Sequence, residues 1–470
     1  MAMAQDSSSS SLLRALDTAI VTPSGPPLPP SCLPLTFLDL QWIHSPPVER
    51  IFFYRIASTR DATDHLISDL KRSLSTALRV YVPLAGHLRV THGCTTAATR
   101  HDIVYEPGDG VAFTVAEYDG ADLGDLASDH QPRPVSELAR LVPRLHPAVG
   151  DYGAALLAVQ ATVLQPHGNL ALGVTVHHAA CDGVGSTGFL HTWEAACSGA
   201  VESLPPPPVI DRTLVVEPVE GLYEHYTRNL PSTDEIEFVK MSPDQLLATF
   251  TLSGEQLQRV KDAVDGEAAR RGSQTPPRCS TLVAALGFVW SCYLRVKTET
   301  SDGAREPESP TYFIVPVDHR PWMKPPVPAT YFGNCIGPAI GAATKRDLYS
   351  AGAGGLFTAC SAGIARAVAS PEWETMVERV KEVGARGVLS VAGSPRLRVY
   401  GVDFGFGPPA KVEIVSVART GAMAVAEMRG QGGGVEVGMS LPLAGMAAFR
   451  SCFDDAVAWL ASSHSTSYSC

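Results

Sequence analysis

The stretch of sequence that decides the fold is "VTVHHAACDGVGSTGFLHTW", from Val174 to Trp193. The apolar residues at positions 170, 172, 174 and 176 alternate with smaller or polar residues, which predicts a β-strand with one strongly buried face. After it, Phe189, Leu190 and Trp193 recur at helical spacing and predict a helix. The connection between them holds His178 and Asp182 together with three glycines.

Gly183, Gly185 and Gly188 have the spacing G-x-G-x-x-G, which is typical of a dinucleotide-binding loop when the first glycine directly follows the strand. Here "HAACD" comes between the strand and Gly183. Glu202, at about the distance expected for the acidic ribose ligand, stands beside a proline run with no strand before it. We therefore predict that Gly183 allows a tight turn, and that Gly185 and Gly188 allow close helix packing.

His178 is the candidate catalytic residue. A neutral imidazole can take a proton from an alcohol that attacks a carbonyl carbon, provided that the ring is held in one orientation and one tautomer. A hydrogen-bonded core histidine is the alternative. His177 lies on the strand and is expected to face packing, whereas Asp182 stands where a carboxylate caps a helix start.

Length and composition exclude several classes of protein. A chain of 470 residues predicts two domains of roughly 200 residues each. The net charge of −11 argues against a nucleic-acid partner and against an anionic membrane surface. We find no signal peptide and no apolar run long enough to span a membrane, and the 10 cysteines form no C-x-x-C pair. These features predict a cytoplasmic protein with reduced thiols and no metal site.

The chain divides at the prolines Pro205–Pro208, which cannot sit inside a helix or a central strand. We predict an N-terminal domain over residues 1–200, a proline-rich linker over 201–235 and a C-terminal domain over 236–470. Both halves mix strands and helices, which predicts an α/β or α+β protein with mixed sheets.

Six further segments are expected to form regular structure. The apolar spacing predicts helices over residues 60–78 and 280–296 and a final amphipathic helix around residues 446–460. The stretches "KVEIVSV", "AMAVAEMR" and "VEVGMSL" predict three consecutive strands that pair as a meander.

Five motifs, in order along the chain, resemble those of the plant BAHD family of CoA-dependent acyltransferases. They are "LTFLDL" (35–40), "YVPLAGHLR" (81–89), H-x-x-x-D-G (178–183), "PATYFGNCIGP" (328–338) and "YGVDFGFGPPAKVE" (400–413). The resemblance spans roughly residues 12–460, and "YFGNC" is similar to the branch that acylates anthocyanins and other phenolic glycosides.

The resemblance implies two similar-sized domains of the chloramphenicol acetyltransferase type with a solvent channel between them. Acyl-CoA is then the co-substrate and a phenolic or flavonoid glycoside is the acceptor, with no bound cofactor and a monomeric enzyme. His178 would act as general base in a direct transfer. A covalent acyl-enzyme on Cys181 is the alternative route, and a buried, unreactive thiol is the expected role of that residue.

The resemblance also implies structural roles around the site. Asp182 would pair with Arg320 and, with Gly183, hold the loop; the alternative is that Asp182 orients His178 as a triad aspartate does. Structural roles are likewise implied for Asp403 and for the glycines of its motif, Gly405 and Gly407.

Contacts with the substrates are implied at six further positions. Ser280 and Thr281 match a region that contacts CoA, with N-capping as the alternative. The remaining four, which are assigned to the substrate channel, are Thr36, Tyr331, Asn334 and Phe406. Asn334 has turn capping as its alternative role.

Two departures from the family pattern bear on the reaction. Phe406 replaces the tryptophan of D-F-G-W-G, which keeps the aromatic bulk and loses the indole N–H. The segment "GVGSTGFLHTW" holds no Arg or Lys to pair with a malonyl carboxylate. This absence weakens a malonyl assignment and leaves hydroxycinnamoyl donors open. A catalytically silent, ligand-binding homologue and a nucleotide-linked oxidoreductase remain as alternative functions.

Overall fold

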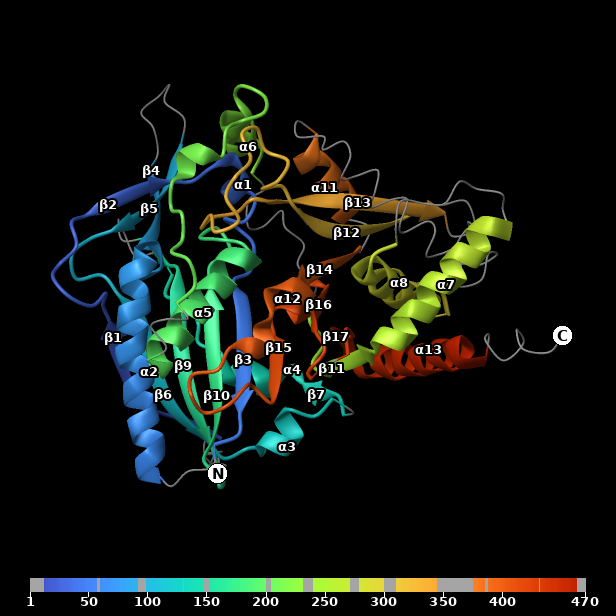
Figure 1. The fold of residues 1–470 in the computed structure, drawn as a ribbon, viewed down its shortest axis with the longest axis horizontal. Coiled ribbons are helices and arrows are strands. Elements are labelled where there is room, and N and C mark those ends of the chain that lie inside the picture. The colour runs from blue at the N-terminus through green and yellow to red at the C-terminus, as the bar shows by residue number, and fades with distance from the viewer. Residues whose placement is uncertain are drawn as a thin grey trace, which may run out of the picture.

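The computed structural model describes residues 12–56, 60–91, 99–129, 131–147, 153–199, 204–230, 240–270, 279–299, 310–344, 375–384, 388–430 and 432–462. Two large sheets and one small sheet are packed with helices (Figure 1). The mixed α/β fold class is therefore confirmed. No helix in these ranges is long and apolar enough to cross a membrane.

The first sheet has the strand order β1-β6-β9-β10-β3-β15. Its strands are β1 (Leu13–Val21), β6 (Val111–Tyr118), β9 (Leu157–Leu164), β10 (Asn169–Val176), β3 (Val48–Tyr54) and β15 (Lys411–Ile414). Helices α2 (Arg60–Val80) and α5 (Gly183–Ser198) pack on one face (Figure 1). The Trp193 indole N–H ties the two helices together by donating to the Leu70 carbonyl at 3.1 Å.

The prediction of one buried face on β10 is wrong, because both faces are buried. Ala171 and Thr175, which point away from the leucines, are 0% exposed. A Cβ on Gly173 would lie 2.1 Å from the Leu141 carbonyl oxygen, so backbone from residues 139–142 covers this second face. β10 is a central strand, so both of its faces are covered. Small residues line the second face, and the alternation of large and small side chains therefore resembles that of a strand with only one buried face.

The second sheet has the order β13-β12-β14-β16-β17-β11-β7 and is covered by α7, α8 and α13. Its strands are β13 (Ile336–Thr344), β12 (Pro310–Asp318), β14 (Leu389–Gly393), β16 (Ala422–Glu427), β17 (Val435–Pro442), β11 (Gln245–Leu252) and β7 (Arg133–Pro134), and the helices are α7 (Gly254–Arg270), α8 (Thr281–Glu299) and α13 (Leu443–Ser462). The predicted helices over 60–78, 280–296 and 446–460 correspond to α2, α8 and α13.

A third, small sheet has the order β2-β5-β4-β8. Its strands are β2 (Ser31–Pro34), β5 (Arg100–Tyr105), β4 (His87–Thr91) and β8 (Ala154–Ala155). Short helices complete the described structure: α1 (Phe37–Leu40), α3 (Leu123–Leu126), α4 (Val135–Leu138), α6 (Leu222–Asn229), α11 (Met376–Gly384) and α12 (Val417–Thr420).

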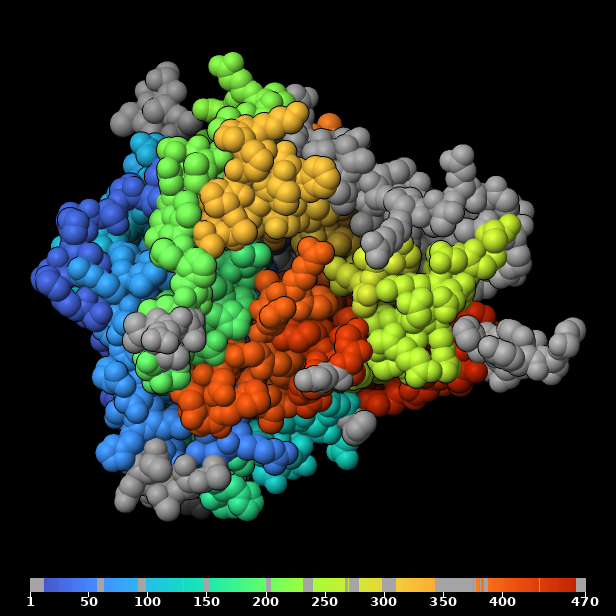
Figure 2. Space-filling view, in the orientation of Figure 1, coloured from blue at the N-terminus to red at the C-terminus, as the bar shows by residue number. Residues whose placement is uncertain are grey.

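The predicted meander is wrong at its first strand. β16 and β17 pair antiparallel, but β15 joins the other sheet, where Ile414 lies opposite Arg50 of β3. α12 follows β15 and turns the chain from one sheet to the other. Conversely, β7 from the first half of the chain pairs with β11. Each sheet thus receives a strand from the other half, and segments from both halves lie side by side (Figure 2).

The predicted linker is described over residues 204–230, and Glu202 lies outside the described residues. The prolines at 205–208 lie outside helices and strands, and Val209 then bridges to Tyr331. The domain boundaries at 200 and 235 stay a prediction.

Candidate active site

The loop between β10 and α5 carries both His178 and Asp182, at the place the sequence predicts. Asp182 is the N-cap of α5, and its carboxylate accepts the backbone N–H groups of Val184 and Gly185, each at 3.1 Å. Such a cap satisfies the first amide groups of the helix, which have no carbonyl partner within it. The helix start is therefore fixed at Asp182, four residues beyond His178.

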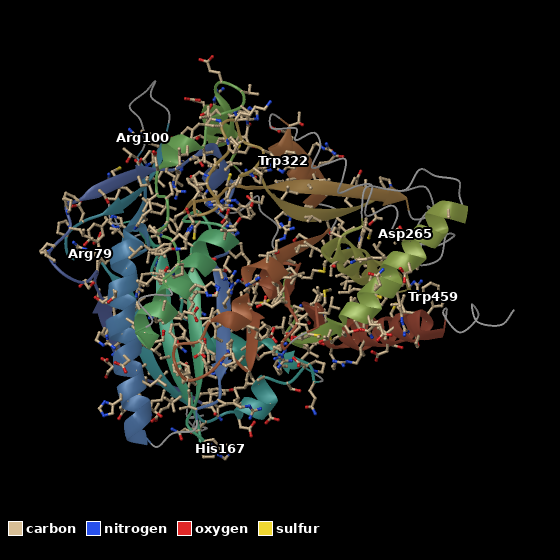
Figure 3. The ribbon with its side chains drawn as sticks, viewed as in Figure 1. Arg79, Arg100, His167, Asp265, Trp322 and Trp459 are labelled. Carbon is tan, nitrogen blue, oxygen red and sulfur yellow. The ribbon has the colours of Figure 1, made fainter. Side chains whose placement is uncertain are left out.

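Asp182 is held from its other side by Arg320, which follows β12. The guanidinium Nη1 lies 2.9 Å from Oδ2 and Nη2 donates to Oδ1 at 3.0 Å, and both side chains are almost fully buried. The Cys335 backbone N–H also donates to Oδ2, at 3.0 Å. None of these bonds goes to His178. Trp322, two residues after Arg320, is 63% exposed, so this segment binds the loop on one side and meets solvent on the other (Figure 3).

A second buried polar cluster lies behind His178 and centres on Asp39 of α1. The Asp39 carboxylate accepts the Asn334 backbone N–H and its side-chain Nδ2–H, each at 2.9 Å, and the Thr36 hydroxyl at 2.8 Å. Arg212 lies 3.6 Å from the same carboxylate. Asn334 Nδ2 also donates to the His178 carbonyl oxygen at 2.9 Å. The cluster therefore fixes the backbone of His178.

The His178 ring stacks on Trp42, with 3.8 Å between the ring centroids and 9° between the planes. The residue is partly exposed, whereas its Nδ1 is itself buried and has no hydrogen-bond partner among the described residues. Burial is the largest effect on the pKa of His178 and lowers it below the ordinary value of 6.5, although Asp182 acts in the opposite direction. A neutral imidazole that is held in one orientation is able to accept a proton.

His177 differs from its neighbour in its contacts. Its Nδ1 accepts the Ala179 backbone N–H at 3.2 Å, so this nitrogen is used within the loop. Burial, with His178 close by, lowers the pKa of His177 to about 4. His177 follows the last residue of β10 rather than lying on the strand.

Three residues assigned to the substrate channel support the loop from behind, and their contact with substrate stays a prediction. Tyr331 and Asn334 are 0% exposed, and Thr36 is 8% exposed. The Tyr331 hydroxyl accepts a hydrogen bond from Arg212 at 3.0 Å. These side chains are occupied by the buried clusters around Asp39 and Arg320, which the sequence spacing does not show.

The fourth channel assignment, Phe406, makes a packing contact, and its contact with substrate stays a prediction. Its ring packs edge-on against Tyr54, 4.8 Å between centroids, at the end of β3 farthest from the His178 loop. Seven strand residues separate the two ends, on the order of 20 Å. Asp403 Oδ1 accepts the backbone N–H groups of Gly405 and Gly407 at 2.8 and 2.9 Å.

Both motif glycines have positive φ, 99° at Gly405 and 100° at Gly407, a backbone region that glycine enters without steric cost. The turn around Asp403 therefore requires glycine at these positions. Its place beside Tyr54 is consistent with the structural roles implied for Asp403, Gly405 and Gly407, which stay a prediction.

The glycines after Asp182 lie so close to neighbouring side chains that a larger residue would crowd them. A Cβ on Gly185 would lie 2.7 Å from the Cys181 Cβ, and one on Gly188 would lie 3.0 Å from the Tyr81 hydroxyl. Gly183 is the first residue of α5 and is not among the glycines with positive φ, so the predicted tight turn is wrong. A Cβ there would lie 3.0 Å from Leu397.

Two alternatives from the sequence concern Cys181 and the start of α8. Cys181 is 2% exposed, and burial, together with the nearby Asp182, raises the pKa of its thiol. A protonated thiol is a poor nucleophile.

Ser280 accepts the Val283 backbone N–H at 3.2 Å, and the Thr281 hydroxyl accepts from Lys261 at 3.0 Å. The N-capping alternative for Ser280 is thus present, and contact with CoA stays a prediction.

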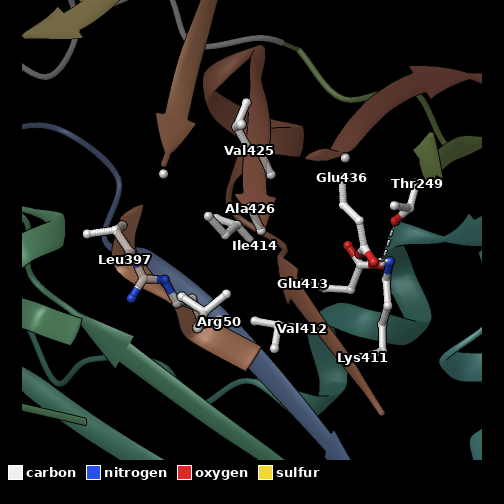
Figure 4. Close-up of a pocket in the computed structure, with 14 residues that line it drawn as sticks. Arg50, Thr249, Leu397, Lys411, Val412, Glu413, Ile414, Val425, Ala426 and Glu436 are labelled. Carbon is white, nitrogen blue, oxygen red and sulfur yellow. Dashed lines mark hydrogen bonds and ion pairs between the residues drawn. The ribbon is translucent and has the colours of Figure 1, made fainter. Parts of the chain in front are cut away.

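A pocket lies where the two large sheets meet, between β3 and β15 on one side and β14, β16 and β17 on the other (Figure 4). Arg50 and Leu397 line it on the side of the His178 loop. Arg50 is buried and reaches the N-terminal part of α5, where Nη1 lies 3.4 Å from the Thr187 hydroxyl. Segments from both halves of the chain therefore form one site region.

Sequence reasoning missed the four residues Asp39, Trp42, Arg50 and Arg212. Asp39 stands inside the motif "LTFLDL", where a carboxylate in an apolar run is itself a signal of a buried polar partner. Arg50 lies in the buried strand "VERIFFY", where a positively charged side chain is equally unexpected. Trp42 and Arg212 carry no comparable signal, because their contacts come from chain folding alone.

The chain is similar to known proteins over almost its whole length. Residues 13–456 match the Transferase family. Phenolic glucoside malonyltransferase 1 from Arabidopsis thaliana is 33% identical, over 92% of this chain and 95% of its own length. Coumaroyl-CoA:anthocyanidin 3-O-glucoside-6''-O-coumaroyltransferase 1 from the same plant is 30% identical, over 94% of this chain and 97% of its own length.

Two solved structures share the fold. Vinorine synthase has a TM-score of 0.66 at 21% identity and covers 93% of this chain and 96% of its own. F. graminearum TRI101, complexed with coenzyme A and T-2 mycotoxin, has a TM-score of 0.61 at 18% identity, over 90% of this chain and 97% of its own. Because the family match covers almost the whole chain, this protein belongs to the Transferase family of BAHD acyltransferases and is an acyl-CoA-dependent acyltransferase.

Proposed function

We propose that this chain transfers an acyl group from acyl-CoA to a hydroxyl of a phenolic or flavonoid glycoside, with His178 as the general base. The observation that carries the proposal is the state of the His178 ring, which is partly exposed and held in one orientation by stacking on Trp42. Relatives named as malonyl- and coumaroyltransferases of phenolic and anthocyanidin glucosides support the acceptor class and leave both donor classes open.

The proposed reaction is a direct transfer. His178 removes the proton of the acceptor hydroxyl as its oxygen attacks the thioester carbonyl carbon, which forms the new C–O bond. The C–S bond of the tetrahedral intermediate then breaks, and the proton on His178 passes to the CoA sulfur. The products are the acylated glycoside and free CoA thiol, so the protein returns to its starting state.

The loop contacts support this role in two ways. Asn334 holds the His178 carbonyl and Trp42 holds the ring face, so little orientation remains to be imposed when the substrates bind. Asp182 is engaged by Arg320 and by the α5 amides, which favours a structural role for this carboxylate over that of a triad aspartate.

The test compares the wild type with His178→Ala and His177→Ala. Malonyl-CoA and coumaroyl-CoA are offered with a phenolic glucoside, and both the product mass and free CoA thiol are measured. We expect His178→Ala to lose at least about 10³-fold in kcat while CoA binding by calorimetry is kept, and His177→Ala to keep most of its activity. Turnover retained by folded His178→Ala would refute the base assignment. If the wild type binds CoA but forms no product from either donor, the result would favour a catalytically silent, ligand-binding homologue.

A further inference from the structure

His191 of α5 lies between two hydrogen-bond acceptors. Its Nδ1 lies 2.9 Å from Glu194 Oε1, and its Nε2 lies 3.4 Å from the Leu397 carbonyl oxygen. The second oxygen of Glu194 accepts the Asp403 backbone N–H, so this carboxylate acts as an acceptor on both sides. A neutral imidazole carries one N–H and can donate to only one of the two acceptors. The arrangement therefore matches the doubly protonated, positively charged ring.

A second carboxylate lies beyond the ring. Glu427 of β16 accepts the Tyr400 backbone N–H at 2.7 Å. The next residue, Gly401, lies against the ring, since a Cβ there would be 3.7 Å from His191 Cε1. Carboxylates near an imidazole favour its charged form. The hydrogen bond with Glu194 is the largest effect on the pKa of His191 and raises it above 6.5, while burial acts in the opposite direction.

The carbonyl that His191 contacts belongs to a strained turn, residues 394–398. Arg398 has φ 52° and ψ 48° and is the only residue other than glycine with positive φ among those that the structure describes. Contacts from outside a turn keep such a residue in the left-handed region, because the conformation itself is unfavourable. The contact from His191 supplies one of these restraints. The cations of the turn, Arg396 and Arg398, are exposed, so water and salt screen their repulsion of the ring.

Leu397 connects this turn with the site. Its side chain lines the pocket in Figure 4, and a Cβ on Gly183 would lie 3.0 Å from Leu397 Cδ1. Gly183 is the first residue of α5 and follows Asp182, the cap at the end of the His178 loop. The side chain of Leu397 therefore lies against the start of α5, while His191 holds its backbone about two turns further along the same helix.

We propose that protonated His191 is a positioning residue for the acyl transfer, because it holds the 394–398 turn so that Leu397 forms one wall of the space that acyl-CoA enters beside the His178 loop. The proposal rests on the acyl transfer proposed above. Loss of the proton leaves one acceptor without a donor, so the strained turn relaxes and Leu397 moves away from Gly183. Acyl-CoA then binds more weakly as the pH rises.

This effect is separate from the titration of the proposed base. Protonation of His178 removes the base and lowers kcat on the acidic side of the pH profile. Deprotonation of His191 weakens acyl-CoA binding and raises KM on the alkaline side. The two histidines therefore act on different kinetic constants and at opposite ends of the profile.

The test measures kcat and the KM for acyl-CoA between about pH 6 and pH 9, with a phenolic glucoside at saturation. We expect the wild-type KM to rise about tenfold over this range, the lower end for losing a hydrogen bond to a charged group, while kcat changes little above neutral pH. His191→Gln is neutral at every pH and should show the high KM throughout. His191→Lys stays positively charged and should keep at least part of the low KM throughout.

Two further variants sharpen the assignment. Glu194→Gln keeps an oxygen for the Asp403 N–H but removes the charge, so the rise in KM should move to lower pH. His225→Gln is the matched control, since His225 also lies beside a carboxylate, 3.6 Å from Glu378, but does not line the pocket. It should leave the rise in place.

KM does not depend on the folded fraction, so a poorly folding variant still gives an answer. Titration of the acyl-CoA phosphates acts alike on every variant and cancels in the comparison. A wild-type KM that stays constant over the range, or a rise of equal size in His191→Gln, would overturn the proposal.

Calorimetry separates this proposal from the acyl transfer on which it rests. Binding of CoA is measured at about pH 6.5 and pH 8.5 for the wild type and His191→Gln, without an acceptor. Weaker binding at the higher pH in the wild type alone would support the positioning role even if no product formed, in which case the proposed function alone would fail. Turnover with a KM that is independent of His191 would retain the function and refute the positioning role.

Discussion

Replacing Asp182 by Asn tests whether this residue belongs to the architecture or to the chemistry. Its two oxygens accept three backbone N–H groups, from Val184, Gly185 and Cys335, and two contacts from Arg320. Asn keeps one carbonyl oxygen for the helix cap but removes the buried one of the two carboxylates beside Arg320; the other, Asp318, lies 3.1 Å from Arg320 and is half-exposed. Breaking a buried ion pair costs about 3–5 kcal/mol, which is the upper value here because Asp318 remains.

The expected shift in melting temperature follows from the size of the chain. If its 470 residues unfold as one unit, the unfolding entropy near the midpoint is about 1 kcal/mol per degree. Asp182→Asn should therefore melt about 3–5 °C lower than the wild type in a thermal scan. The protein that remains folded at 25 °C should keep its kcat within about tenfold, because no bond from Asp182 reaches His178.

Asp403→Asn is the matched control. Asp403 also caps two backbone N–H groups but forms no ion pair among the described residues, so its melting temperature should fall by less than half as much. The reasoning is refuted if Asp182→Asn melts within 1 °C of the wild type, roughly 1 kcal/mol, and loses about 10⁴-fold in kcat. That result would place Asp182 in the chemistry as a triad-type aspartate.

The remaining predictions concern Cys181 and His177, which lie in the same connection between β10 and α5 as His178. Cys181→Ala should turn over within a few-fold of the wild type, because burial keeps the thiol protonated; an acyl adduct on the wild type, seen by intact mass and absent from the variant, would contradict this. The pKa of His177 falls from 6.5 to about 4 on folding, so the unfolded chain binds more protons between these values and stability decreases as the pH drops from 6.5 to 4. His177→Asn keeps an acceptor for the Ala179 N–H, and its melting temperature should vary less with pH over this range; an unchanged slope would rule out His177 as a source of acid sensitivity.

Local sequence determined the strand–loop–helix unit and the order of elements around it. Alternation in β10, helical spacing in α5 and a carboxylate at the helix start each follow from neighbours within a few residues. These local signals place His178 at the end of a buried strand, where a side chain is displayed. The same signals predict α2, α8 and α13, whose apolar faces repeat over several turns.

The pairing of β15 was decided by the tertiary structure. "KVEIVSV" predicts a strand, but whether it pairs with β16 or with β3 depends on how α12 turns the chain and on which sheet edge is open. The same applies to Phe406, Tyr331 and Asn334, whose motifs were recognised in the sequence but whose packing was not: Tyr331 and Asn334 are buried, and Phe406 packs against Tyr54.

Some of the charged residues at the site were predicted from the sequence, and others were found only in the structure. The Asp182–Arg320 pair was expected from family resemblance, and the structure contains it. Asp39 holds Asn334, which bonds the His178 carbonyl, and Arg50 reaches Ser186 of α5; both residues come from more than 120 positions before His178 in the chain. A sequence pattern reports what each residue does to its near neighbours, whereas charge balance inside a pocket depends on which distant side chains share the same low-dielectric space, and folding alone sets that.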